Sequence, residues 1–98
     1  MAAVVHQKGI LRQKRGEYDG ALELYQKSLA IQERLGDLAG MSKSHWAIGV
    51  VHLAREEKEK AREALRRAAA LFREMKLPVP VQLEKLLADL DGEEGRGG

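Results

Sequence analysis

The chain has 98 residues, a size at which folding removes only roughly 60–65% of the unfolded chain's surface from water, so we expect one domain of modest stability. Aromatic residues make up 4% of the sequence, while Ala, Leu, Glu, Lys and Arg are abundant, which favours an all-α fold over a sheet. The formal net charge is only +2, so charge alone does not indicate a nucleic-acid partner. The sequence has no cysteine, which excludes disulfides and thiolate metal sites and agrees with a reducing, cytoplasmic setting.

The first four predicted elements are helices, because apolar residues recur along them at spacings of three and four. They cover residues 2–14, 18–35, 38 to about 54, and 58–76. Gly16 allows the turn between the first two helices. Gly36 suits the left-handed position after the second helix, and Asp37 can cap the backbone N–H groups of the third.

A fifth helix is predicted after two prolines, Pro78 and Pro80, which cannot continue a helix but can begin one. Its apolar residues have amphipathic spacing and predict a capping helix over residues 79–90: Val81, Leu83, Leu86, Leu87 and Leu90. Residues 91–98 are predicted to form a flexible tail. No apolar run approaches the length of a membrane span, and the first residues resemble no targeting signal, so no membrane association is expected.

The sequence also repeats itself after about forty residues. Gly9 returns as Gly49 and Ala21 as Ala61, so small residues fall on small ones. Apolar residues fall on apolar ones in the same register. The repeat predicts two stacked helix-turn-helix units, residues 2–36 and 38–77, within one domain of residues 1–90. The small residues would let the helix axes approach closely.

These residues resemble the tetratricopeptide repeat in its long form of about forty residues per unit. The resemblance rests on glycine after a large apolar residue in the first helix and on small residues and an aromatic in the second: Ile48-Gly49, Gly16, Ala21, Tyr25, Ser28 and Leu35-Gly36-Asp37. It implies a right-handed α-α superhelix of two units and a C-terminal capping helix. Lys8, Arg12 and His52 depart from the family pattern, and we expect the aliphatic stems of Lys8 and Arg12 to cover apolar surface.

The resemblance further implies a non-enzymatic protein-interaction module, which binds a partner peptide or helix in a concave groove. Carried over by position, the groove would be lined by residues from the first helix of each unit: His6, Gln7, Ile10, Gln13 and Lys14, then Lys43, Trp46, Ala47, Val50 and Leu53. Trp46 suits the core and the groove equally. The alternative is a structural element that assembles with itself, burying exposed helix faces in a homodimer.

No catalytic, cofactor or metal site and no small-molecule substrate is predicted. His45 and His52 are seven residues apart, but a metal site needs three or four converging ligands. The serines show no nucleophile motif and no evident base. A basic cluster at Lys8, Arg12, Lys14 and Arg15 has no interleaved aromatics, so nucleic acid is not the expected partner. The chain has no asparagine, which argues against the terminal-carboxylate clamp of chaperone-binding members of the family.

Overall fold

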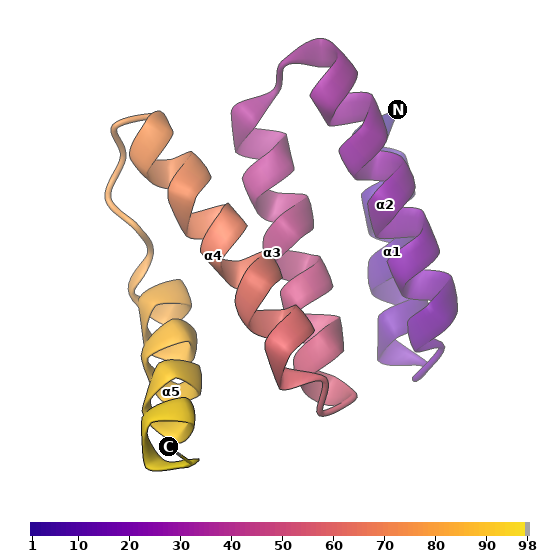
Figure 1. The fold of residues 1–98 in the computed structure, drawn as a ribbon. Helices are drawn as coiled ribbons and strands as arrows, with labels where there is room; N and C mark the ends of the chain where they lie inside the picture. The colour runs from indigo at the N-terminus through magenta and orange to yellow at the C-terminus, as the bar shows by residue number, and fades with distance from the viewer. Residues whose placement is uncertain (98) are drawn as a thin grey trace.

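The computed structural model describes the backbone of residues 1–97 and the side chains of residues 1–92. Five helices follow one another: α1 (Ala2–Lys14), α2 (Tyr18–Leu35), α3 (Leu38–Ala54), α4 (Lys58–Glu74) and α5 (Val81–Gly97). Figure 1 shows them side by side in chain order, with α1 behind α2, α3 crossing behind α4, and α5 at the far end. Each helix packs on the one that follows it, in a body of 42 × 34 × 18 Å. The fold is therefore all-α, a helical-repeat solenoid, as predicted.

The first three helices begin and end where the sequence predicted. Gly16 and Gly36 both adopt left-handed backbone angles, with φ of 78° and 68°. The Asp37 side chain caps α3, because its Oδ1 accepts a hydrogen bond from the Gly40 N–H at 2.9 Å. Local turn chemistry thus accounts for the path of the chain from α1 into α3.

Two buried clusters hold the helices together. One joins α2 to the second unit through Ala21, Tyr25, Ile48, Val51 and Ala64. The other joins α4 to α5, through residues that are at most 3% exposed: Ala61, Leu65, Ala68, Ala69, Leu83 and Leu90. Since the second cluster includes residues of α5, this helix seals the open end of the second unit.

The predicted close approach of helices is present at one glycine in each unit. A Cβ atom built on Gly9 would lie 2.7 Å from Cε1 of Tyr25, and one built on Gly49 would lie 2.7 Å from Cγ of Leu65. Real Cβ atoms do not come so near to carbon, so only glycine fits without a shift of the neighbouring side chain. Both neighbours come from the second helix of the same unit.

The two turns of the second unit repeat the geometry of the first without its glycines. Glu56, forty residues after Gly16, and Lys76, forty after Gly36, each have a φ of 60°. The fourth helix therefore ends at Glu74 rather than at the predicted residue 76, because Lys76 has left the helical conformation. Sequence reasoning missed these two positions, since neither carries a residue that favours positive φ.

The prediction for the C-terminal segment was wrong in its bounds. α5 begins at Val81 rather than at residue 79, because Val79 precedes a proline and the Pro80 carbonyl accepts the first helical hydrogen bond, from Glu84 N. The helix continues to Gly97, whereas the predicted helix ended at residue 90 and left residues 91–98 as a tail. Glu93, Glu94 and Arg96 tolerate a helix, but Gly92, Gly95 and Gly97 disfavour one, so local propensity does not explain the extension. Residue 98 lies outside the described residues.

Candidate partner-binding face

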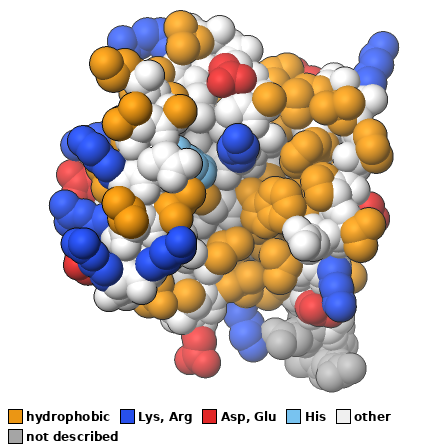
Figure 2. All heavy atoms as spheres, turned by 180° about the vertical axis from the view of Figure 1, so that it is seen from behind, with side chains coloured by type: hydrophobic (Ala, Val, Ile, Leu, Met, Phe, Trp, Pro, Cys, Tyr) orange, Lys and Arg blue, Asp and Glu red, His pale blue; other side chains and the backbone are white. Residues whose placement is uncertain are grey.

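The predicted groove residues lie on the first helices of the two units, α1 and α3. Figure 2 shows the molecule from the side on which these helices lie in front of α2 and α4. Apolar side chains gather most densely over the half that carries α3 and α5, whereas Lys and Arg side chains surround the half that carries α1 and α2. The face is thus divided into a basic half and an apolar half.

An open pocket of about 310 Å³ lies where the start of α1 meets the end of α2 and the start of α3. Three of the predicted groove residues, His6, Gln7 and Lys43, line it together with Gln32 and Asp37. Lys43 is exposed at its rim. The structure therefore brings together predicted residues from both units at one concave place.

His6 is held by packing rather than by hydrogen bonds. Its ring lies 5.1 Å from the Tyr25 ring, centre to centre, and its Nδ1 is buried without a hydrogen-bond partner among the described residues. Burial lowers the pKa of His6 below the usual 6.5, and the nearby Lys43 ammonium lowers this pKa further. His6 therefore adds little positive charge to the pocket at neutral pH.

The other predicted residues of α1 divide between core and surface. Gln13 Oε1 accepts a hydrogen bond of 2.6 Å from the Tyr25 hydroxyl, and Ile10 packs against the cluster around Ala21 and Tyr25. Lys14 is exposed. Two of these three side chains thus support the packing of α1 on α2, and Lys14 alone of the three is exposed.

On α3, the predicted apolar residues are half-buried. Trp46 and Leu53 pack against the cluster that joins α4 to α5, alongside Leu86 and Leu87. Ala47 packs against the other cluster, and Val50 is half-buried as well. Trp46 stands forty residues after His6. The His6 ring packs against Tyr25, and Trp46 packs against the cluster that includes Leu65, forty residues after Tyr25. Trp46 has contacts with the core and retains an accessible surface.

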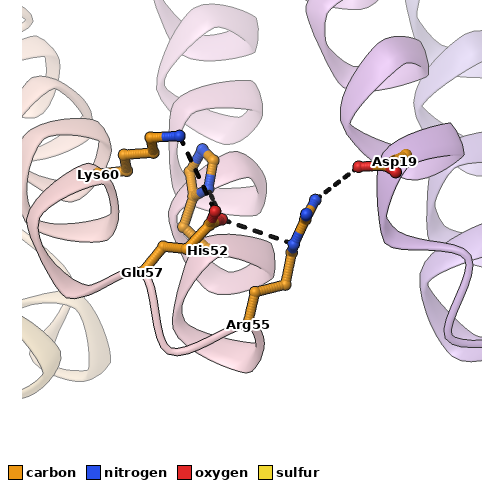
Figure 3. Close-up of polar contacts among 5 residues, drawn as sticks. All are labelled: Asp19, His52, Arg55, Glu57 and Lys60. Carbon is orange, nitrogen blue, oxygen red and sulfur yellow. Dashed lines mark hydrogen bonds and ion pairs between the residues drawn. The ribbon is translucent and has the colours of Figure 1, made fainter.

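A chain of ion pairs links the two units away from the pocket, where α3 ends and where α2 and α4 begin. Arg55 Nη1 lies 2.6 Å from Asp19 Oδ1 of α2, and Arg55 Nε lies 3.6 Å from Glu57 Oε1. His52 Nδ1 donates to the same Glu57 oxygen at 2.8 Å, and Lys60 Nζ lies 3.8 Å from Glu57 Oε2 (Figure 3). The hydrogen bond from His52 is the main cause of a lowered pKa of Glu57. The first unit has a weaker counterpart, Arg12 Nη1 to Glu17 Oε1 at 3.6 Å.

The family model described as tetratricopeptide repeat matches residues 1–74. The chain belongs to the tetratricopeptide repeat family. The comparison with curated proteins gave no match. The matched range covers α1 to α4, both repeat units, and ends at the last residue of α4.

Tetratricopeptide repeats generally mediate protein–protein interaction and are generally non-enzymatic scaffolds. Three serine hydroxyls of this repeat pair have structural hydrogen-bond partners. Each of the hydroxyls of Ser28, Ser42 and Ser44 donates a hydrogen bond of 2.7 Å, to Ala2 O, Ala39 O and Gln32 Oε1 respectively. Among the described residues, no three His, Cys, Asp or Glu side chains converge as metal ligands. In the part of the chain that the structure describes, no helix is long and apolar enough to span a membrane.

Sequence reasoning missed the contacts that tie one tetratricopeptide unit to the next. The buried Ser44 hydroxyl donates to Gln32 Oε1, and Arg55 reaches Asp19, each across the boundary between α2 and α3. A signal for the second contact was present, because Arg15 recurs as Arg55 in the repeat register. The identity of the acidic partner depends on how the two units stack, which the register alone does not specify.

Proposed function

We propose that this tetratricopeptide repeat pair binds a protein partner, as an extended peptide or a helix, along the face formed by α1 and α3. One observation supports the proposal: Trp46, Val50 and Leu53 of α3 are half-buried apolar side chains, whereas Lys14 of α1 and Lys43 of α3 are exposed. A partner with apolar anchors and acidic residues would complement both halves. His6, Ile10 and Gln13 would support the face rather than contact the partner through their polar atoms.

The proposal is tested by capture with immobilised chain from cell extract, followed by the same capture with variants. Lys14→Glu with Lys43→Glu reverses two exposed charges, so the fold should persist while an acidic partner is lost. Lys85→Glu on α5 is the matched control, since Lys85 is also exposed. A protein retained by the wild type and the control but not by the double variant supports the proposal. Equal capture by all three contradicts it.

A second variant tests the apolar half. Trp46→Ala with Val50→Ala should abolish capture of the same protein while circular dichroism shows that most helicity remains. Loss of the helical signal would mean that these side chains act mainly in the core, so the apolar half of the binding face would be wrongly assigned. A cytoplasmic location stays a prediction.

The second candidate function is self-assembly into a homodimer. It is favoured by large apolar side chains exposed on α1, Val4 and Leu11, which are more than half accessible. The cations beside those two residues, Lys8 and Arg15, favour an acidic partner over a second copy of the chain.

A further inference from the structure

One side of α1 is uncovered along its whole length. Val4, Lys8, Leu11 and Arg15 are spaced by four, three and four residues, so they share one side of the helix. All four are exposed, and the apolar Val4 and Leu11 are 56% and 57% accessible. We call these four residues the α1 edge. It is distinct from the binding face proposed above, which uses other residues of α1.

The same side of α3 is covered. The equivalent residues, forty positions later, are Ser44, Ile48, Val51 and Arg55. Ser44 and Val51 are 0% exposed and Ile48 is 8% exposed. The cover is α2: its Gln32 accepts the hydrogen bond of Ser44, and its Ala21 and Tyr25 pack with Ile48 and Val51. The repeat therefore contains both the uncovered and the covered form of one surface.

The polar end of the covered surface shows what an occupant needs. Arg55, the C-cap residue of α3, binds Asp19 in the first turn of α2 at 2.6 Å. Arg15 is the C-cap residue of α1 and has no ion pair among the described residues. Lys8 stands at the position that Ile48 has in the second unit, and it adds a second cation to the α1 edge. The α1 edge thus presents two apolar and two cationic side chains, and an occupant that covers the cations must offer them acidic partners.

A second copy of the chain meets this requirement poorly. In repeat stacking, the residues of α4 that correspond to the covering side of α2, such as Ala61 and Leu65, would have to be free, but Leu83 and Leu90 of α5 pack on them. Pairing of two α1 edges would bring Lys8 and Arg15 of both copies into one contact, where like charges repel. Charge complementarity therefore favours an acidic partner over self-pairing.

We propose that the α1 edge binds an amphipathic helix of a partner protein, with an acidic side chain in its first turn and small or apolar residues along one side, as α2 covers α3. The acidic side chain pairs with Arg15 in the way that Asp19 pairs with Arg55. The apolar side covers Val4 and Leu11, and a further acidic residue at mid-helix faces Lys8.

The probe is a synthetic peptide with the sequence of residues 17–36, acetylated and amidated, because this sequence covers the equivalent surface in the second unit. It is titrated into the full ¹⁵N-labelled chain and followed by amide NMR shifts. We expect saturable shifts that centre on residues 4–15. Leu11→Asp in the chain should weaken binding by about tenfold or more, since it places a charge in the apolar contact. The Asp19→Asn form of the peptide should bind several-fold more weakly.

The matched control is Val81→Asp on α5, which changes a 79% exposed valine in the same way and should leave the affinity unchanged. The proposal is overturned by any of four results. These are no saturable shift up to about 1 mM peptide, shifts that centre on α3 or α5, equal affinity of the Leu11→Asp and Val81→Asp chains, or a dimer that Leu11→Asp dissociates. The last result would assign the α1 edge to a second copy.

Discussion

Gly49 sets the distance between α3 and α4, because a Cβ there would lie 2.7 Å from Cγ and Cδ2 of the fully buried Leu65. Gly92 of α5 differs in this respect, since a Cβ on it would meet nothing within 4 Å. Close packing thus requires glycine at position 49 but not at position 92. The same substitution at both positions separates helix propensity from helix packing.

We expect Gly49→Ala to lower the free energy of unfolding by about 1 kcal/mol, because overpacking costs about 1–3 kcal/mol and the gain in helix propensity offsets about 1 kcal/mol. Gly92→Ala should instead raise it by up to about 1 kcal/mol. Urea denaturation of the two variants and the wild type measures both changes. If Gly49→Ala is as stabilising as Gly92→Ala, then α3 and α4 do not approach as closely as described.

The His6 pocket makes a prediction about pH. Burial, and then Lys43, lower the folded-state pKa of His6 below 6.5, so protonation favours the unfolded chain. The stability due to neutral His6 is fully present above pH 6.5 and is lost as the pH falls through the lower folded-state pKa. Imidazole titration by NMR should give a pKa below 6.5, raised by Lys43→Met but still below 6.5. Lys85→Met on α5 is the control, and an equal effect of both variants would exclude Lys43 as a cause.

At the scale of the elements, each unit contains the same two left-handed turn positions, whichever residues occupy them. Gly16 and Gly36 meet this need in the first unit at no steric cost. Glu56 and Lys76 adopt a φ of 60° in the second, although an L-residue with a side chain loses roughly 1–2 kcal/mol in this region. The packing of the helices that each turn joins, rather than the preference of these residues, therefore determines their conformation.

Replacing Glu56 by glycine should therefore stabilise the fold. The relief of backbone strain exceeds the added entropy of the unfolded chain, so we expect a net gain of about 0.5–1 kcal/mol. Glu59→Gly, inside α4, should lower the free energy of unfolding by about 0.5–1 kcal/mol. Thermal and urea unfolding of both variants gives the comparison. A destabilised Glu56→Gly chain would mean that the Glu56 side chain contributes more than its backbone costs.

The element boundaries also show what sequence can predict. α1, α2 and α3 were found from apolar spacing, Gly16, Gly36 and the Asp37 cap, all of which act within a few residues. The end of α4 was missed because no local signal marks Lys76. The extent of α5 was missed because the glycines among its last residues disfavour a helix. For the binding face, the repeat register gave the positions on α1 and α3. It could not show that Gln13 bonds Tyr25 or that Trp46 packs towards α5, since both depend on how helices pack.

For the molecule as a whole, α5 has the place that a further repeat would occupy. Its Leu83 and Leu90 are buried against α4, and Arg62 and Arg66 of α4 lie 3.3 Å and 3.0 Å from Asp91 Oδ1. Repeat proteins need terminal helices with a polar outer side, and α5 has one in Gln82, Glu84, Lys85 and Asp89, which are exposed. α5 thus covers one side of α4, whereas no helix among the described residues covers the α1 edge.

Leu83 gives the test of capping. Leu83→Ala should lower the free energy of unfolding by about 2 kcal/mol or more, because it leaves a cavity in the cluster between α4 and α5. Val81→Ala, on an exposed residue two positions earlier, should change it by less than about 0.5 kcal/mol. Equal effects in urea denaturation would show that α5 does not pack on α4 as described.

The central claim is that two repeat units and α5 fold as one body and leave their binding surfaces free for a different protein. The most direct test is the absolute mass in solution, measured by light scattering on a sizing column over about a hundredfold range of concentration. We predict 10.9 kDa throughout, the mass of one chain. A mass of twice that value which persists on dilution would contradict the claim, because a second copy would then complete the core and cover surfaces assigned here to a partner.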